Sequence, residues 1–229
     1  MLHPNNNNSN NQFKQKYNDW RNYVLQFGFS QKFQDTDIGT QKSGSIPTQS
    51  YFDKIYGKKG WKAITIRSLS IGQGEILVTP LQLANQMAAI ANDGYYITPH
   101  LNKHDSMLLH KHQIDIEPKH FEVVKKGMHR VMTYGTGRHY RIDGIEVAGK
   151  TGTAENPHGK DHAIFIGFAP LENPQIAVAV VVENAGFGAT WAAPIASLMI
   201  EQYLTGEIKR KDLKNRIANT AINESVKIW

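Results

Sequence analysis

The sequence predicts an α/β (α+β) fold in which an antiparallel sheet is flanked by helices. Three short runs with the composition of strands follow one another over residues 145–183, and runs with helical periodicity lie on both sides of them. Each helix and strand has an apolar face to bury, so this order implies a sheet with at least one helix packed across it. No internal repeat is visible in the 229 residues, which suffice for one large domain or two small ones.

The helix predicted over residues 80–93 has the clearest boundary signals. Thr79 is a suitable N-cap, Pro80 suits the first helical position, and Gln82 completes a capping box. Gly94 is placed to end the helix. One face of this helix is apolar and consists of Leu83, Met87, Ile90 and Ala91.

Hydrophobic residues at helical spacing predict three further helices. One covers residues 19–29, and another covers residues 192–204, after the strands. The third covers residues 118–132, and its apolar stripe consists of Phe121, Val124, Met128, Val131 and Met132.

The strands are predicted over residues 145–153, 163–169 and 175–183. Residues 170–174 begin and end with proline and make a tight connection between the second and third strands. We therefore expect these two strands to form an antiparallel hairpin.

Both ends of the chain differ in composition from its middle. Residues 1–16 begin with an asparagine-rich stretch, which predicts a disordered or low-complexity end. Residues 206–229 form a basic tail, in which 209–216 is the densest basic stretch of a chain with net charge +6 and a pI near 9.3. Because no nucleic-acid-binding motif accompanies this stretch, we expect a solvated tail and no nucleic-acid partner.

Several classes of protein are excluded by composition. The chain has no cysteine, so it has no disulfide, no cysteine-ligated zinc and no thiol nucleophile. Its longest apolar run, residues 176–182, is far shorter than the roughly 20 residues of a membrane helix. No signal peptide is recognisable after Met1, so we expect that nothing in this chain anchors or exports it.

Lys150, Thr151 and Gly152 form a triplet inside the first predicted strand. The lysine supplies a positive charge for an anionic substrate, and the Thr151 hydroxyl can hydrogen-bond the same carboxylate. Because Gly152 has no side chain, the backbone of a ligand can lie against the strand there. The N–H of Thr153 can then point to the place where an oxyanion develops. The triplet alone also fits a surface Lys-Thr-Gly at a strand end.

Two alternative sites are less favoured by their context. Residues 144–151 formally match a phosphate-binding loop, but their first half has strand composition and residues 152–157 begin a helix poorly. Three close histidine pairs lack the spacing of a zinc protease or a zinc finger, so we expect structural or exposed histidines, no metal and no cofactor. These pairs are His100 with His104, His110 with His112, and His158 with His162.

Three segments of the chain resemble the high-molecular-weight, monofunctional penicillin-binding proteins. Residues 68–84 (Ser-Leu-Ser-Ile-Gly-Gln-Gly-Glu-Ile-Leu-Val-Thr-Pro-Leu-Gln-Leu-Ala) and 148–155 (Ala-Gly-Lys-Thr-Gly-Thr-Ala-Glu) are similar to hallmarks of that family. Residues 161–184 resemble the elongation type, penicillin-binding protein 2, more than the division type. The resemblance covers roughly residues 17–205 and implies the C-terminal part of a transpeptidase domain, with a β-lactamase/transpeptidase-like fold.

Two of the three motifs of this superfamily are missing. S-x-x-K, S-D-N and K-T-G make up the set, yet no serine in the chain is followed by a lysine three residues later. The single S-x-N, at residues 9–11, lies in the asparagine run, and we regard it as a coincidence. We therefore expect that the N-terminal part of the domain is missing and that the sequence is a fragment or a truncated product.

The resemblance implies a function for the intact protein. It would be a serine D,D-transpeptidase that cross-links peptidoglycan stem peptides ending in D-Ala-D-Ala and is acylated by β-lactams. Lys150, Thr151, Gly152 and Thr153 would bind the substrate, and Lys150, Thr151 and Thr153 would act in catalysis. Asp161 and His162 also fit the family pattern and are expected to orient the strand beside the triplet.

The resemblance also implies a location and a partner. The intact protein would sit in the inner membrane with its catalytic domain on the periplasmic side, beside a glycan-polymerising membrane partner. The chain itself lacks the nucleophile and should be inactive. A β-lactamase or carboxypeptidase is disfavoured by residues 72–84. A non-catalytic product that binds a β-lactam or a partner remains the alternative.

Overall fold

The computed structural model describes residues 6–222, and the chain divides into two compact units. The first comprises the described residues up to Thr79 together with Ile97–Asp115. The second comprises Pro80–Tyr96 and the described residues from Ile116 onward. The sheet and the Lys-Thr-Gly triplet belong to the second unit.

A three-stranded antiparallel sheet is the centre of the second unit. Its order is β3 (Ala148–Ala154), β4 (His162–Ala169) and β5 (Ile176–Val182). The predicted hairpin is confirmed, because β4 and β5 pair in an antiparallel register in which Ala169 lies opposite Ile176. All three predicted strands are present, and β3 starts three residues later than the predicted 145, because Ile145 lies in a bridged turn with Ile142.

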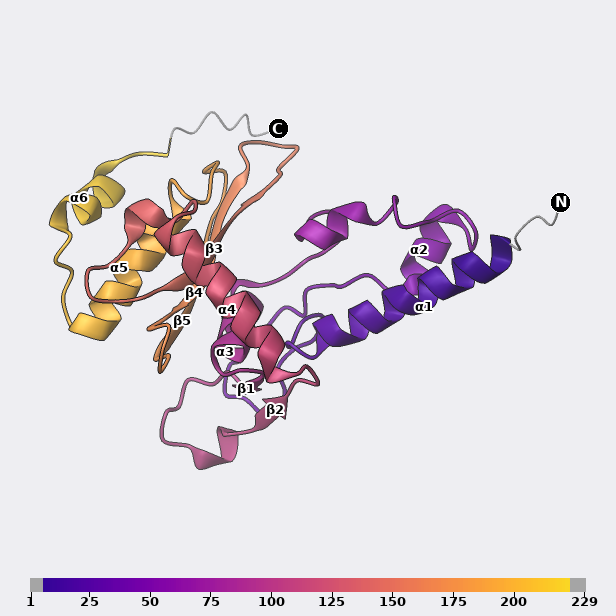
Figure 1. Ribbon diagram of the computed structural model, residues 1–229, viewed down its shortest axis with the longest axis horizontal. Helices are drawn as coiled ribbons and strands as arrows, with labels where there is room; N and C mark the ends of the chain where they lie inside the picture. Colours follow the sequence, from indigo (N-terminus) through magenta and orange to yellow (C-terminus); the bar gives the residue numbers. More distant parts are fainter. Residues whose placement is uncertain (1–5, 223–229) are drawn as a thin grey trace. The chain divides into compact units, whose positions relative to one another are not determined.

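Helices pack on this sheet from both sides, as the sequence predicts. Helices α3 (Pro80–Ala91) and α5 (Ala192–Thr205) pack on β4 and β5, and α4 (Pro118–Thr133) packs on β3. Figure 1 shows α5 on one side of the strands and α4 on the other. Between α5 and the sheet lie the buried side chains of Phe165, Val178, Val180, Ala192, Ala196 and Ile200.

A glycine in β3 makes room for the core. A Cβ on Gly149 would lie 2.3 Å from Cζ of Phe165, whose side chain is completely buried. Gly149 pairs with Gly167, so this part of the β3–β4 ladder carries no side chain on either strand. The Phe165 ring fills that space, and the strand that carries Lys150 is thereby fixed to the core.

The basic tail predicted over residues 206–229 contains a helix in the part that the structure describes, and no residue of this helix is buried. Helix α6 (Lys211–Asn219) follows α5, and Arg210 ties the connection to the second unit. Its Nε donates to Oε2 of Glu201 at 3.0 Å, and its Nη2 donates to the carbonyl of Ser197 at 2.9 Å. Glu201 is buried, so its charge needs this partner. Residues 223–229 lie outside the described residues.

From Asn6 onward, the structure has a helix where the sequence predicts a disordered or low-complexity end. Helix α1 spans Asn6–Leu25, so it also contains residues 19–25 of the helix predicted over residues 19–29. Phe13, Tyr17 and Trp20 recur at helical spacing and pack beside the cluster of buried residues that includes Trp61. Burial of this aromatic stripe outweighs the poor helix propensity of asparagine.

The rest of the first unit is made of short elements. These are α2 (Gln49–Tyr56), the 3₁₀ turns η1 (Arg67–Ile71) and η2 (Ser106–Leu108), and the strand β2 (Lys111–Gln113). Strand β1 (Tyr95–Ile97) ends in this unit and pairs with β2 in a two-stranded sheet. Neither α2 nor β2 is foreseen from the sequence.

A part-buried ion pair lies beside the aromatic core of the first unit. Nζ of Lys14 donates to Oδ1 of Asp53 at 2.6 Å, and Nε1 of Trp61 donates to the same oxygen at 2.7 Å. These two donors, with Lys14 first, hold the pKa of the Asp53 carboxyl below its usual range. In the same cluster, burial raises the pKa of the Tyr17 phenol to about 12.

The ion pair predicts a pH-dependent effect of Asp53→Asn. The variant removes the anion from the Lys14 ammonium, which keeps the carbonyl of Lys58 as an acceptor, and its free energy of unfolding at pH 7 should be about 1–2 kcal/mol lower than that of the parent. The pKa of Asp53 is lower in the folded state than its value near 3.8 in the unfolded state. Asp53 therefore stabilises the folded state above pH ~3.8, and this stabilisation is lost as the pH falls through the folded-state pKa. Urea unfolding of the parent and the variant from pH 7 to 2.5 should therefore show that the difference between their free energies of unfolding becomes smaller below pH ~3.8. A difference that stays constant over this range would contradict the role of the ion pair.

Candidate active site on strand β3

The Lys-Thr-Gly triplet lies in the middle of β3. Lys150 pairs with Ile166 of β4, and Gly152 pairs with Ile164. Within residues 6–222, no strand pairs with the other edge of β3. Because β3 continues through Thr151 to Ala154, residues 144–151 do not form the strand-to-helix turn that a phosphate-binding loop requires.

The side chain of Lys150 is exposed on this strand. Its Nζ donates to the carbonyl oxygen of Thr151 at 2.5 Å. Among the described residues, no carboxylate forms an ion pair with Lys150, so the positive charge is not neutralised within the second unit. An ammonium has three donors, and two of them remain to bind an anion.

The Thr151 hydroxyl is held by a residue that sequence reasoning missed. Oγ1 of Thr136 lies 2.7 Å from Oγ1 of Thr151, whose residue is only 9% exposed. Thr136 stands in the turn after α4, and this turn is tightly packed, because a Cβ on Gly137 would lie 2.4 Å from Sδ of Met132. The end of α4 therefore fixes the orientation of the Thr151 hydroxyl.

The backbone of β3 presents alternate residues to its free edge. The Thr151 carbonyl receives the Lys150 ammonium and so points away from the ladder with β4. Because backbone groups alternate along a strand, those of Thr153 point to the same edge as those of Thr151. The sequence-predicted residues Lys150, Thr151, Gly152 and Thr153 are therefore brought together along one strand.

The loop before α5 packs closely on Gly152. A Cβ on Gly188 would lie 2.3 Å from the carbonyl oxygens of both Gly152 and Ile164. The backbone of this loop thus lies directly on the strand pair that carries the triplet. Gly152 lacks a side chain, as the approach of a ligand backbone requires, and a Cβ on Gly152 would lie 3.4 Å from Cβ of Ile164.

Polar residues tie this loop to the β3–β4 connection. The N–H of Asn184 donates to Nδ1 of His162 at 3.1 Å, and the N–H of Gly186 donates to the carbonyl of Asp161 at 2.7 Å. Nδ2 of Asn156 donates to Oδ1 of Asn184 at 2.6 Å. Because Nδ1 of His162 accepts a hydrogen bond, the neutral ring carries its proton on Nε2. Asp161 and His162 therefore hold the loop that lies on Gly152.

Other histidines have partners outside this site. Nδ1 of His100 lies 2.7 Å from the carbonyl of Thr98, and Nε2 of His112 lies 2.8 Å from its hydroxyl. In the part of the chain that the structure describes, no three histidine, aspartate or glutamate side chains gather as metal ligands would.

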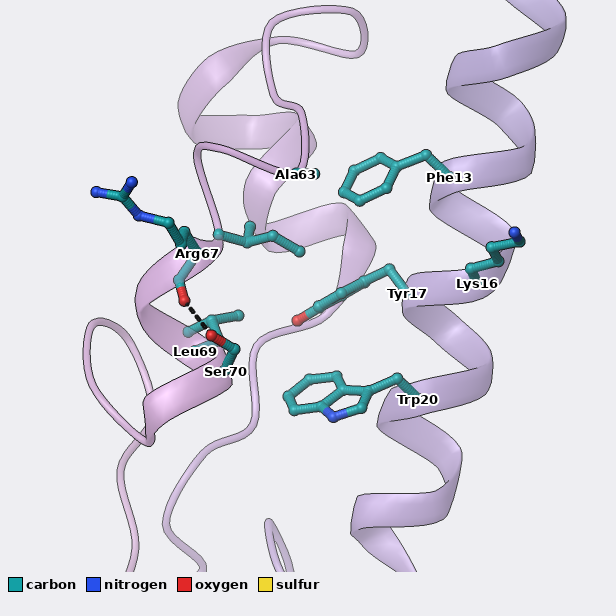
Figure 2. Close-up of a pocket in the computed structure, with 9 residues that line it drawn as sticks. Phe13, Lys16, Tyr17, Trp20, Ala63, Arg67, Leu69 and Ser70 are labelled. Atoms are coloured by element: carbon teal, nitrogen blue, oxygen red, sulfur yellow. Dashed lines mark hydrogen bonds between the residues drawn. The ribbon is translucent and has the colours of Figure 1, made fainter. Parts of the chain in front are cut away.

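The first unit contains an apolar cavity of about 380 Å³. Figure 2 shows Phe13, Tyr17 and Trp20 of α1 pointing toward Leu69 and the segment around it. In the same view, the charged ends of Lys16 and Arg67 point away from this space. The cavity is lined by residues of the first unit, and the hydroxyl of Ser70, which belongs to this lining, donates to the carbonyl of Arg67.

An antiparallel sheet that carries Lys-Thr-Gly on an edge strand is typical of the serine enzymes that react with β-lactams, the β-lactamases and penicillin-binding proteins. Within that class, the model of the penicillin binding protein transpeptidase domain matches residues 8–201. The chain belongs to this family.

Curated relatives agree with the predicted type, penicillin-binding protein 2. The chain is 33% identical to the peptidoglycan D,D-transpeptidase MrdA of Haemophilus influenzae over 85% of its length, which is 34% of that protein. It is 32% identical to the MrdA of Acinetobacter baumannii, over 88% of this chain and 33% of that one. The chain thus spans about a third of the curated relatives it matches. Within residues 6–222, no helix is long and apolar enough to cross a membrane.

Solved structures give the same result. The structure of Pseudomonas aeruginosa PBP2 in complex with WCK 5153 is similar with a TM-score of 0.74 and 34% identity, over 85% of this chain and 44% of that one. The PBP2 in the complex with MreC from Helicobacter pylori has a TM-score of 0.68 and 26% identity, over 79% of this chain and 34% of that one. The predicted fold class and family are confirmed.

Proposed function

We propose that this chain supplies the carboxylate-binding and part of the oxyanion-binding site of a serine D,D-transpeptidase that cross-links peptidoglycan. The observation that carries the proposal is the pair of Lys150 and Thr151 on the free edge of β3. The ammonium has no anionic partner among the described residues, and the hydroxyl is oriented by Thr136. A cation beside an oriented hydroxyl suits a terminal carboxylate.

In the proposed reaction, a serine outside this chain attacks the peptide bond of D-Ala-D-Ala at the end of a stem peptide. Its hydroxyl proton is removed, an ester forms, and the terminal D-alanine leaves as a protonated amine. An amine of a neighbouring stem then attacks the ester, which yields the cross-link and the free serine. Lys150 and Thr151 hold the carboxylate of the donor, and the N–H of Thr153 stabilises the oxyanion. A β-lactam takes the donor's place and leaves the serine acylated.

The location and the partners of the intact protein belong to the same proposal. We place it in the inner membrane with its catalytic domain on the periplasmic side, next to a glycan-polymerising partner. Support comes from the solved structure of a peptidoglycan synthase complex that coordinates polymerization and crosslinking. The matched chain of that complex is 27% identical to this chain over 76% of it, with a TM-score of 0.61.

A second candidate function follows from the missing nucleophile. Because no serine of this sequence has a lysine three residues later, the 229-residue chain by itself could bind a β-lactam or a partner without reacting. The two candidates differ in whether the chain works as part of a complete enzyme or alone.

Covalent labelling with a fluorescent penicillin distinguishes them. The 229-residue chain should not be labelled, because it lacks the nucleophile. A hybrid enzyme, in which this chain replaces the matching segment of the Haemophilus influenzae relative, should be labelled at an active-site serine and should lose the label on competition with unlabelled penicillin. A folded hybrid that takes no label would contradict the proposed role, and labelling of the chain alone would refute its inactivity.

The contact between Thr136 and Thr151 predicts a second effect in the hybrid enzyme. Thr136→Val removes the hydroxyl that orients Thr151 and should slow acylation by penicillin about three- to ten-fold, the worth of one neutral hydrogen bond. Thr136→Ser keeps the hydroxyl and should retain most of the rate. Stopped-flow acylation measures both, and equal rates for the two variants would exclude an orienting role.

A further inference from the structure

The turn after α4, which carries Thr136, is a short and tightly hydrogen-bonded segment. Where it leaves α4, the N–H of Gly137 donates to a carbonyl of the helix at 3.0 Å. Where it leads toward β3, it forms η3 (Arg138–Tyr140), in which the N–H of Tyr140 donates to the carbonyl of Gly137 at 2.9 Å. Because these bonds link the two ends of the turn, a displacement at Tyr140 also displaces the Thr136 hydroxyl that orients Thr151.

Arg210, which follows α5, holds the second end of this turn. Its Nη1 lies 3.2 Å from the carbonyl oxygen of Arg141 and 3.4 Å from that of Tyr140. On the side of α5, its Nε donates to Glu201 at 3.0 Å and its Nη2 donates to the carbonyl of Ser197 at 2.9 Å. One planar guanidinium with its fork of donors therefore joins the turn to α5, the helix that packs on β4 and β5.

The guanidinium of Arg210 is itself fixed in place. Glu201 is 3% exposed, and its second carboxylate oxygen accepts the N–H of Lys209 at 3.3 Å. A buried carboxylate is costly without a cation, so Glu201 keeps Arg210 at this position. Arg216 of α6 adds a second contact to the same turn, because its guanidinium lies over the ring of Tyr140 at 5.8 Å from the ring centroid.

We propose that Arg210 is a positioning residue of the transpeptidase site. Through η3 and Thr136, it fixes the hydroxyl of Thr151 in the orientation that binds the carboxylate of the substrate. The match to the transpeptidase domain model ends at residue 201, so this role belongs to a segment that lies beyond the match. The inference rests on the proposed function, because Arg210 affects acylation only if Thr151 binds the substrate.

Arg210→Lys separates positioning from folding. A lysine ammonium still neutralises Glu201, but it lacks the fork of donors that reaches α5 and η3 together. In the hybrid enzyme, this variant should slow acylation by penicillin about two- to five-fold, which is less than the effect of Thr136→Val. Arg21→Lys is the matched control. Arg21 belongs to the first unit and donates to the carbonyl of Ile46, so its replacement should leave acylation unchanged.

A double variant of the hybrid enzyme shows whether Arg210 acts through Thr136. If it does, Arg210→Lys has no further effect on acylation once Thr136→Val has removed the orienting hydroxyl. The proposal alone is overturned if Arg210→Lys reacts as fast as the parent, or if it slows acylation by the same factor with and without that hydroxyl. A parent hybrid that takes no penicillin label gives a different result, which overturns the proposed function and this inference with it.

Hydrogen exchange in the 229-residue chain tests the contact between Arg210 and the turn without reference to activity. In Arg210→Lys, the N–H of Tyr140 should exchange at least about two-fold faster than in the parent, because η3 opens more often. The N–H of Met128, in the middle of α4, should exchange at the parental rate. The proposal is overturned if the Tyr140 N–H exchanges at the parental rate, or if both N–H groups are accelerated by the same factor, as a general loss of stability would cause.

Discussion

Replacing Lys150 with alanine in the hybrid enzyme lowers the rate of acylation by penicillin about ten- to a hundred-fold. The estimate corresponds to the loss of one hydrogen bond to a charged group, about 1.5–3 kcal/mol. Lys150 has no carboxylate partner among the described residues, so its charge is available to the substrate carboxylate rather than to a structural ion pair. Stopped-flow measurement of the second-order rate constant for acylation checks the result.

A lysine on α4 provides the control. Lys126 is exposed and forms an ion pair only at 3.8 Å with Glu122 of the same helix, so Lys126→Ala should leave acylation unchanged. If the acylation rate falls by the same factor in both variants, the loss is caused by the lower net charge of the protein and not by damage to a carboxylate-binding site. If Lys150→Ala keeps the parental rate, the assignment of Lys150 is wrong.

Replacing Gly188 with alanine lowers the free energy of unfolding of the second unit by about 3 kcal/mol, at the upper end of the cost of overpacking. The added Cβ would lie 2.3 Å from two backbone carbonyl oxygens, those of Gly152 and Ile164, and neither oxygen can rotate away. The loop or the strand pair must therefore shift. Thermal and urea unfolding of the 229-residue chain measures the loss.

The same substitution in α4 should have the opposite sign. Nothing lies within 4 Å of a Cβ on Gly127, which stands inside the helix. Gly127→Ala should therefore raise the free energy of unfolding by about 0.5–1 kcal/mol, because alanine loses less backbone entropy. If the Gly188→Ala variant is as stable as the parent, the loop before α5 does not lie on Gly152.

The sheet and its helices could be predicted because local sequence and packing agree there. Residues 176–182 are β-branched or small and apolar, and Met87, Ile90 and Ala91 are buried on α3 as their spacing predicts. Val124 of α4 is an exception and is 44% exposed. The helix packs on a single strand, β3, so its buried stripe is narrower than its hydrophobic pattern.

The first part of helix α1, before the predicted start at residue 19, could not be predicted, because the contacts that stabilise it involve residues elsewhere in the chain. An asparagine-rich segment has poor helix propensity. Helix α1 is stabilised by Phe13 and Tyr17, whose partners Phe52 and Trp61 are distant in sequence. Only tertiary contacts reveal that this stripe is buried. The ion pair between Arg210 and Glu201 could not be predicted for a similar reason, because the burial of Glu201 in α5 is not visible in the sequence.

The sequence predicts the residues of the candidate site but not the residues that hold them in place. Lys150, Thr151, Gly152 and Thr153, to which we assign the proposed chemistry, are adjacent in sequence, so one motif reveals all four. Thr136, Asn156 and Asn184 act through contacts with residues distant in sequence, and no single-sequence pattern brings them to the site. The one signal in the sequence was the glycine on each side of Thr136, which marks a tight turn after α4.

The central claim, that Lys150 binds the carboxylate of the substrate, is tested most directly by comparing penicillin with its methyl ester. Acylation rates of the hybrid enzyme and of its Lys150→Ala variant are measured with both compounds. If Lys150 binds the carboxylate, the parent reacts much faster with penicillin than with the ester, and the variant loses most of that preference. A variant that keeps the full preference while reacting more slowly with both compounds would contradict the account.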